Sequence, residues 1–411
     1  MSTQHLWLFT MRFPHGTGEP FLENELEVLA QHYPRITVVP LFAEGVQRRV
    51  PSNVEVRPLV KQPYAAAGAA TMLRHWRTYQ QAARSVRRTA PDRATLNAQW
   101  PALRSRLRQA LHRALAVAPV LFKAHGPEET TLYSYWTSDW ATVLGMVQAM
   151  DPRVRFVSRM HGFDLYAERA AGGWPAFQAF HLERVERVFV ASQAGLDDLV
   201  RRYPEARDRF ELAHLGTVDH GPGPWSPSDT LRLVSCSNLV PLKRVLLLAE
   251  ALRHVQVPVR WTHFGDGPER SPLEAALSAL PRHVQAELRG AVPNADLLGW
   301  YRSTPVDLFV HLSASEGGVP VSMQEAASFG VPLLATAAGG APELVGPGTG
   351  ELLPLDVDAR TVAAAIDRMA HGVCRDAGFR EGVRAAWSAG FRATVNHARF
   401  IGRMEGALHP R

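Results

Sequence analysis

The chain alternates short apolar runs with amphipathic stretches, and this alternation restarts once along its length. The first half has strand-like runs at residues 5–13, 36–41, 131–136, 155–161 and 188–192, with a helical stretch at 21–31. A Gly- and Pro-rich segment at 216–228 reads as a linker, and the second half has strand-like runs at 231–236, 259–264, 307–312 and 332–337, with helical patterns at 244–253 and 320–329. Short apolar strands that alternate with helices predict parallel sheets covered by helices. We therefore expect an α/β chain with two Rossmann-like domains that face a cleft.

A length of 411 residues fits two domains, which we place at residues 1–215 and 216–385. Ligands of such sheets bind beyond the carboxyl ends of the strands, so the loops that follow strands are the candidate sites. No recognisable repeat of short period accompanies the two strand series.

Composition excludes several protein classes. Apolar residues make up 46% and charged residues 20%, a globular balance. Two cysteines, Cys236 and Cys374, are too few for a disulfide framework or a cysteine zinc site. The first residues read as a strand rather than a signal peptide, and no run of 18 apolar residues occurs. We expect a cytoplasmic protein, with peripheral attachment to the inner face of the cell membrane left open.

Positive charge is concentrated in residues 71–113, which hold ten arginines and one acid, Asp92. This excess predicts an anionic partner. Leucines and tryptophans interleave with the arginines, which fits an interfacial helix on an anionic membrane. The alternative is a helix pair that packs on the first domain with a solvated arginine face. We expect no nucleic-acid partner, because no recognised reader fold accompanies the charge.

The strongest candidate for chemistry is the loop at residues 313–326, which follows a strand and opens a helix. Its glycines allow close backbone approach, and the free amides of a helix start favour a diphosphate. Glu316 precedes the helix and Glu325 lies in it, so one carboxylate can face a sugar while the other binds a ribose. The alternative is a capped helix with a solvated acid.

At these residues the chain resembles the retaining glycosyltransferases of family 4, group 1 enzymes of cell-surface polysaccharide assembly with the GT-B fold. The shared motifs are Ser315-Glu316-Gly317-Gly318-Val319-Pro320, Glu325-Ala326, Gly330-Val331-Pro332 and Gly339-Gly340. The two glutamates are nine residues apart, where the family has eight. We expect the loop to accommodate one extra glycine; the alternative is that Gly317 occupies the position of the first glutamate and Glu316 is displaced by one residue. The resemblance implies that Glu325 binds the ribose, that Glu316 orients the sugar, and that the backbone of Gly317, Gly318, Val319 and Pro320 contacts the donor. It also implies that a C-terminal helix, placed at 386–411, crosses back to the first domain.

A second matching loop is Ser237–Arg244, which follows the first strand of the second domain. The family has an Arg and a Lys here that bind the donor diphosphate. Lys243 matches the Lys, whereas Asn238 stands in the place of the Arg, and Arg244 is a candidate for the missing contact.

Two loops of the first domain also match. His161, in a His-Gly-Phe-Asp-Leu-Tyr stretch, takes the place of a family histidine that reaches the donor sugar, although a lone histidine is more often structural. The loop with Gly16, Thr17 and Gly18 corresponds to one beside the donor phosphates and the acceptor, and its alternative is an ordinary tight turn. Weaker candidates of the same domain are His125, Tyr135 and Asp139.

Together these features predict a retaining glycosyltransferase of hexosyltransferase type that acts without a metal or other cofactor. It would transfer a sugar from a nucleotide diphosphate-sugar donor to a glycan or lipid-linked acceptor in cell-surface polysaccharide synthesis. The donor sugar, its base and the acceptor stay open. The alternatives are a non-catalytic protein that binds a nucleotide sugar or a membrane partner, and a sugar-nucleotide epimerase.

Overall fold

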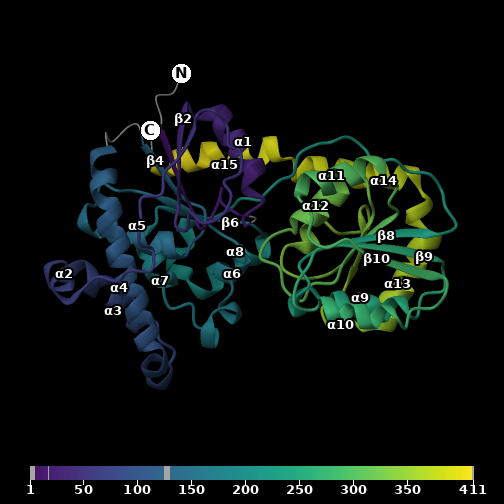
Figure 1. Ribbon diagram of the computed structural model, residues 1–411, viewed down its shortest axis with the longest axis horizontal. Helices are drawn as coiled ribbons and strands as arrows, with labels where there is room; N and C mark the ends of the chain where they lie inside the picture. Colours follow the sequence, from purple (N-terminus) through teal and green to yellow (C-terminus); the bar gives the residue numbers. More distant parts are fainter. Residues whose placement is uncertain (1–4, 17, 125–129, 410–411) are drawn as a thin grey trace. The chain divides into compact units, whose positions relative to one another are not determined.

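The computed structural model describes residues 5–16, 18–124 and 130–409, and the chain divides into two compact units (Figure 1). The first unit comprises residues 1–191, 195–213 and 397–411, and the second comprises 192–194 and 214–396. Each unit contains its own parallel sheet, so the predicted α/β class with two Rossmann-like units is confirmed. The change of unit after residue 213 lies beside the predicted limit at 215, whereas the second unit continues beyond the predicted 385 to residue 396.

The sheet of the first unit has seven parallel strands in the order β3-β2-β1-β4-β5-β6-β7. Its strands are β1 (His5–Thr10), β2 (Arg35–Pro40), β3 (Val54–Val56), β4 (Thr130–Ser134), β5 (Val157–Met160), β6 (Arg187–Val190) and β7 (Phe210–Leu212). The helices of this part of the chain are α1 (Leu22–His32), α2 (Ala69–Arg74), α3 (Trp76–Arg88), α4 (Arg93–Ala124), α5 (Asp139–Met150), α6 (Gly162–Leu165), α7 (Gln178–Arg184) and α8 (Gln193–Arg202).

Alternate residues of β1 fill two different cores. Trp7 and Phe9 pack with residues of α3, α4 and α5 on one face of the sheet. Leu6 and Leu8 pack on the other face with residues of α1 and of the C-terminal helix. Because successive side chains of a strand point to opposite faces, a continuous apolar run is what a strand covered on both sides requires.

The second unit has six parallel strands in the order β10-β9-β8-β11-β12-β13. They are β8 (Leu231–Cys236), β9 (Val259–Phe264), β10 (Val284–Leu288), β11 (Leu308–His311), β12 (Leu333–Thr336) and β13 (Gly350–Leu353). Its helices are α9 (Val245–Leu252), α10 (Arg270–Leu277), α11 (Asn294–Ser303), α12 (Val321–Ser328), α13 (Ala359–His371) and α14 (Ala377–Gly390). Residues of α9 and α13 share one core, and residues of α12 and α14 share the other.

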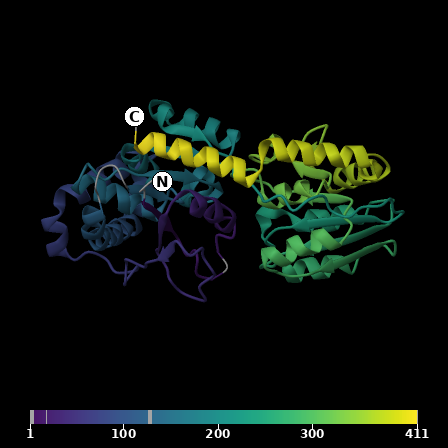
Figure 2. The same cartoon turned by 90° about the horizontal axis from the view of Figure 1, so that it is seen from above.

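The last helix, α15 (Ala393–Leu408), returns to the first unit, as the family resemblance implied. Figure 2 shows this helix in yellow along the first unit. Nε2 of His32 on α1 lies 2.8 Å from Oε1 of Glu405 on α15. The guanidinium of Arg159 on β5 lies 4.1 Å from the ring centroid of Phe400, also on α15.

A buried ion pair underlies this helix. Nη1 of Arg159 donates to Oε2 of Glu25 at 2.6 Å, and both side chains are fully buried. The hydroxyl of Tyr133 donates to the other carboxylate oxygen at 3.0 Å, and Nδ1 of His397 lies 3.7 Å from the first. The pair therefore ties α1, β4, β5 and α15 together, and its charges compensate one another out of water.

The arginine-rich segment forms α2, α3 and most of α4, and it packs on the first sheet. Most of the apolar residues interleaved with its arginines pack in or against the core: Leu96, Trp100, Leu103, Leu107 and Leu111. Leu73 and Trp76 instead stay exposed, at 77% and 52%. The structure therefore shows the packed helix pair, with two large apolar side chains left on its surface. None of the helices in the described residues is long and apolar enough to span a bilayer.

Candidate functional site

The loop between β11 and α12 carries Glu316, and α12 itself carries Glu325. The Gly339-Gly340 turn packs directly against its backbone: a Cβ on Gly339 would lie 1.6 Å from the carbonyl oxygen of Glu316. A Cβ on Gly340 would lie 2.6 Å from the carbonyl carbon of Gly318. Such distances exclude any side chain, so two glycines are required where the turn meets the loop that carries the extra residue.

The Glu316 carboxylate accepts two hydrogen bonds at one oxygen. Nε2 of His311 donates to Oε1 at 2.8 Å, and Nζ of Lys243 donates to the same atom. Burial raises the pKa of this carboxyl, but His311 and Lys243 together outweigh burial and lower it to about 2. Glu316 is therefore ionised at neutral pH, and because a carboxylate only accepts, His311 must carry a proton on Nε2.

The three candidate residues of the β8–α9 loop have different surroundings. Lys243 reaches Glu316, whereas Asn238 is exposed to solvent. Arg244 has a left-handed backbone with φ of 49°, and its guanidinium donates to the carbonyls of Leu312, Ser313 and Leu355. The Arg244 donors thus hold the β11–α12 loop, and a phosphate contact from this side chain stays a prediction.

Glu325 lies inside the second unit on α12, and its exposed fraction is 4%. Its Oε1 accepts a hydrogen bond of 2.8 Å from Nδ2 of Asn294, the first residue of α11. Burial raises the pKa of Glu325 to about 7, and the bond from Asn294 opposes this rise only in part. Burial and the neighbouring Glu325 charge also raise the pKa of the Cys236 thiol to about 12. A buried carboxyl with one donor has acceptor capacity left for hydroxyl groups.

The residues between the two glutamates connect the loop to α12. Pro320 is the N-cap of α12, and Val319 is buried. Nε2 of Gln324 donates to the Val319 carbonyl at 2.9 Å, and Oγ of Ser192 donates to the Gly317 carbonyl at 2.8 Å. These bonds engage two carbonyls of the loop, and the donor contacts expected of Gly317, Gly318, Val319 and Pro320 stay predictions.

His161 lies in a separate cluster in the first unit, directly after β5. Its ring stacks on Tyr135 with centroids 4.8 Å apart and meets the edge of Trp136 at 4.6 Å. Burial, together with the charge of Arg159, lowers the pKa of His161 well below its usual value. The imidazole is therefore neutral at pH 7, and its Nε2 has no hydrogen-bond partner in the described part of the chain.

Asp164 fixes the backbone of the His161 loop. Its carboxylate accepts from the amide of His161 at 2.7 Å and from the amide of Thr137 at 2.8 Å. Burial raises the pKa of Asp164 to about 7, although both backbone bonds lower it.

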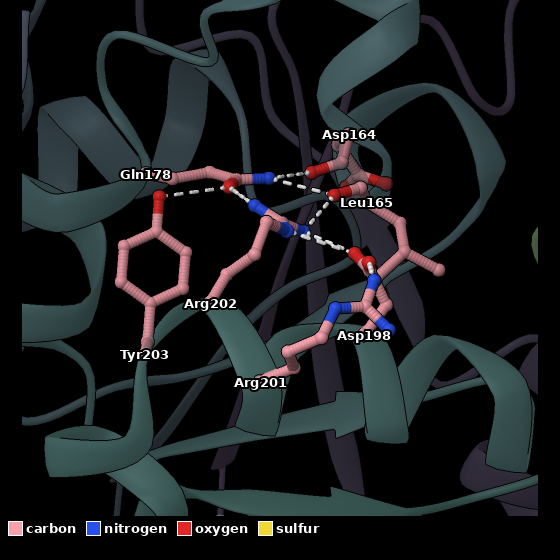
Figure 3. Close-up of polar contacts among 7 residues, drawn as sticks. All are labelled: Asp164, Leu165, Gln178, Asp198, Arg201, Arg202 and Tyr203. Carbon is pink, nitrogen blue, oxygen red and sulfur yellow. Dashed lines mark hydrogen bonds and ion pairs between the residues drawn. The ribbon is translucent and has the colours of Figure 1, made fainter. Parts of the chain in front are cut away.

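A second network holds the far end of α6 (Figure 3). Nε2 of Gln178 donates to the carbonyls of Asp164 and Leu165 at 2.8 and 2.9 Å. Nη2 of Arg202 donates to the Leu165 carbonyl, and its Nη1 donates to Oε1 of Gln178. The turn after His161 is therefore secured from α7 and α8, as a rigid binding loop requires.

The β1–α1 loop, with Gly16 and Gly18, is occupied by a residue of the chain itself. The carboxylate of Glu19 accepts hydrogen bonds from the consecutive amides of Met11, Arg12 and Phe13 at 3.2, 2.7 and 2.7 Å. Nε1 of Trp136 also donates to it at 2.6 Å. Three backbone amides after β1 that could bind a phosphate thus already bind the Glu19 carboxylate. The role of this loop beside the donor phosphates and the acceptor stays a prediction.

The remaining candidates are less informative. Tyr135 is fully buried and stacks on His161, as stated above. Asp139 accepts from Nη1 of Arg113 at 2.6 Å, which indicates a structural role. Thr17 and His125 lie outside the described residues. Among the described residues, no three His, Cys, Asp or Glu side chains gather as metal ligands.

Sequence reasoning missed His311, Glu19 and the ring cluster around His161. His311 is the last residue of β11 and reads as part of an apolar strand, so only its position five residues before Glu316 marks it. Glu19 directly follows the glycines that drew attention to its loop.

Relatives identified by sequence match up to about half of this chain, whereas solved structures match nearly all of it. Residues 230–371 match the family model of glycosyl transferases group 1. A GDP-mannose-dependent alpha-mannosyltransferase of Mycolicibacterium smegmatis is 31% identical over 215 residues, which are 49% of this chain and 52% of that protein. A putative colanic acid biosynthesis glycosyltransferase, WcaL, of Salmonella typhimurium is 26% identical over 147 residues, 34% of this chain and 36% of that protein. The matches thus span about a third to a half of the length of these relatives.

Solved structures match nearly the whole chain. The apo form of the lipopolysaccharide outer core galactosyltransferase WaaB has a TM-score of 0.68 at 12% identity, over 98% of this chain and 99% of that one. Anabaena HepE in complex with UDP and glucose has a TM-score of 0.66 at 18% identity, over 97% and 99%. At these identities the likeness establishes the fold alone, and the family model matches residues 230–371 within the second unit. Residues 230–371 are thus similar to the group 1 glycosyl transferases, and the chain has the GT-B fold.

Proposed function

We propose that the chain transfers a sugar, with retention of anomeric configuration, from a nucleotide diphosphate-sugar to a glycan or lipid-linked acceptor of cell-surface polysaccharide synthesis. The observation that carries the proposal is that Glu316, in the β11–α12 loop, and Glu325, on α12, have pKa values shifted in opposite directions. Glu316 is ionised and bound to Lys243, whereas Glu325 is buried with a pKa raised by burial to about 7. These residues lie in the part of the chain that matches the family.

Lys243 supplies the cation for the donor diphosphate. In the structure its ammonium binds Glu316, so a diphosphate that draws Lys243 away leaves one oxygen of Glu316 bonded to His311 alone. That carboxylate can then accept a hydroxyl of the donor sugar. As the bond to the leaving phosphate breaks, negative charge grows on the diphosphate, and a fixed ammonium stabilises this charge more in the transition state than in the ground state.

Glu325 binds the ribose of the nucleotide. One of its oxygens accepts from Asn294, which leaves acceptor capacity for two vicinal hydroxyls. Donor hydroxyls stabilise the ionised form, so binding lowers the pKa of Glu325 from its raised value. Donor affinity therefore increases as the pH rises through about 7.

His161 binds the donor sugar as a neutral imidazole. Burial keeps it uncharged, and its buried Nε2, which has no partner among the described residues, is the atom that would exchange a hydrogen bond with a sugar hydroxyl. A proton from the acceptor hydroxyl then passes to an oxygen of the leaving phosphate, because a histidine with such a low pKa is a weak base at neutral pH.

The acceptor partner is proposed to be membrane-associated. Leu73 and Trp76 are exposed next to Arg74 and Arg77, a pairing of apolar and cationic side chains that suits an anionic lipid surface. Flotation with vesicles that contain anionic lipid, compared with neutral vesicles, tests this point. Equal recovery with both vesicle types would contradict it.

The function is tested by donor turnover. The protein is incubated with UDP-glucose, GDP-mannose and related donors without acceptor, and released nucleoside diphosphate and free sugar are followed by NMR. We expect slow release with one nucleotide class, with the donor's anomeric configuration in the first sugar formed, and none with Glu316→Gln. Interconversion of intact sugar nucleotides would indicate an epimerase. Binding of a donor without any turnover, with or without cell-envelope glycan extracts, would indicate a non-catalytic protein.

A further inference from the structure

A cavity of about 520 Å³ lies in the first unit, on the face of the sheet that α4 covers. It is lined by two apolar residues of the last turns of α4, Pro119 and Val120, by Trp7 of β1 and by four basic residues: His5, Arg35, Arg57 and Lys123. We call it the β1–β3 cavity. A volume of this size suits a small ligand.

Strand register explains why these residues meet. His5 pairs with Arg35 across β1 and β2, and Trp7 pairs with Thr37, which pairs in turn with Glu55 of β3. Arg57 lies two residues beyond Glu55, so its side chain is on the same face of the sheet. His5 and Arg35 are the first residues of their strands, whereas His161 and the Gly16 loop follow carboxyl ends. The cavity is therefore separate from the first-unit residues of the proposed transferase site.

Charge in the cavity is unbalanced. Arg35 is paired with Glu55 at 3.3 Å, but neither Arg57 nor Lys123 makes a side-chain bond with another described residue. Burial, and then the charge of Arg35, lower the pKa of His5 to about 4, so His5 is neutral at pH 7. Among the residues that the structure describes, three cations and one carboxylate leave an excess of two positive charges beside an apolar wall.

One further donor lies at the wall. Trp7 is 3% exposed, and its indole N–H has no acceptor among the described residues. A buried N–H without an acceptor is uncommon in proteins and calls for an explanation. A ligand that brings in an acceptor oxygen would explain this unpaired N–H. The indole ring also gives an apolar surface for the rest of that ligand.

We propose that the β1–β3 cavity binds a phosphate ester or diphosphate group, with Arg57 and Lys123 as its principal contacts and Arg35 as the third cation. A dianion matches the excess of two charges, and arginine forms paired hydrogen bonds with phosphate oxygens. Trp7, Pro119 and Val120 contact the apolar part of the ester. The ester is either a soluble metabolite or a lipid with a phosphate head group.

The test uses the full chain labelled with 15N at its tryptophan indoles and titrated with inorganic pyrophosphate. The Trp7 resonance is assigned by Trp7→Phe. We expect the Trp7 resonance to shift saturably, and affinity to fall at least about tenfold in the double variant Arg57→Gln/Lys123→Gln, since each removed contact is charge-assisted. Arg93→Gln is the matched control, because it removes one charge at the other end of α4, roughly 45 Å away.

Two further experiments distinguish a lipid phosphate from a soluble ester, and the β1–β3 cavity from the proposed donor site of the second unit. Vesicles of phosphatidylcholine with and without phosphatidic acid replace pyrophosphate: a Trp7 shift with phosphatidic acid assigns a lipid phosphate, and a shift with pyrophosphate alone assigns a soluble ester. Lys243→Met removes the phosphate contact proposed for the second unit and should leave the Trp7 titration unchanged. No Trp7 shift with either probe, or equal affinity in the wild type and the double variant, would overturn the proposal.

Discussion

Glutamine substitution of Glu316 and of Glu325 should shift the stability of the protein in opposite directions. Burial raises the pKa of Glu325 from 4.5 to about 7. The pKa of Glu316 goes from 4.5 to about 2, because the bonds from His311 and Lys243 outweigh burial. The folded state thus favours the protonated form of Glu325 and the ionised form of Glu316.

The magnitudes follow from linkage, at about 1.4 kcal/mol for each pKa unit. The contribution of protonated Glu325 is complete below 4.5 and is lost as the pH rises through about 7, so ionised Glu325 costs about 3 kcal/mol above about pH 8. The contribution of ionised Glu316 is complete above 4.5 and is lost as the pH falls through about 2. At about pH 8, Glu325→Gln should therefore raise the free energy of unfolding by up to about 3 kcal/mol, and Glu316→Gln should lower it by a similar amount.

Urea unfolding of the wild type and both variants, followed by tryptophan fluorescence at about pH 8 and about pH 5, measures these differences. The gain from Glu325→Gln should shrink below about 1 kcal/mol at the lower pH, whereas the loss from Glu316→Gln should persist. Both variants should bind the donor less tightly. Glu325→Gln would therefore be more stable than the wild type and at the same time less active. Shifts of the same sign at the higher pH, or a Glu325→Gln effect independent of pH, would refute the reasoning.

Three further predictions follow from the described contacts. Lys243→Met should weaken binding of a nucleotide diphosphate-sugar at least about tenfold by calorimetry, while Lys61→Met, which removes an exposed charge of the first unit, should not; equal losses would contradict the assignment. Gly340→Ala should abolish donor binding, because its Cβ would lie 2.6 Å from backbone atoms, whereas Gly346→Ala, with nothing within 4 Å, should bind normally. Glu25→Gln strands a buried arginine and should lower the free energy of unfolding by about 3–5 kcal/mol in urea, and a change under about 1 kcal/mol would count against the buried pair.

The strands that sequence patterns located are the central ones. The strands they missed, β3, β7, β10 and β13, lie at the edges of the two sheets. Edge strands are short and partly exposed, as β3 and β13 are here, so they lack the continuous apolar run that identifies a strand buried on both faces. The predicted strand ends also ran too far, because apolar loop residues after a strand extend the same pattern, as for the first strand, expected at 5–13 and observed at 5–10.

The candidate site was predictable where it depends on motif spacing and not where it depends on side-chain pairing. The sequence pointed to Glu316, Glu325 and Lys243, but not to the meeting of Lys243 with Glu316, which are 73 residues apart. In the sequence, Arg244 is as good a candidate for the phosphate contact as Lys243. In the structure, its backbone is left-handed and its guanidinium donates to three carbonyls. Contacts of this kind depend on tertiary packing, which a local pattern does not encode.

The most direct test of the central claim is a thermal-shift screen of UDP-, GDP-, ADP- and dTDP-linked sugars on the wild type, Glu325→Ala and Lys243→Ala. If the second unit holds the donor as proposed, one nucleotide class raises the melting temperature of the wild type, and the shift disappears in both variants. A shift of the same size in both variants would place the donor elsewhere, and no shift with any nucleotide class would contradict donor binding by this chain.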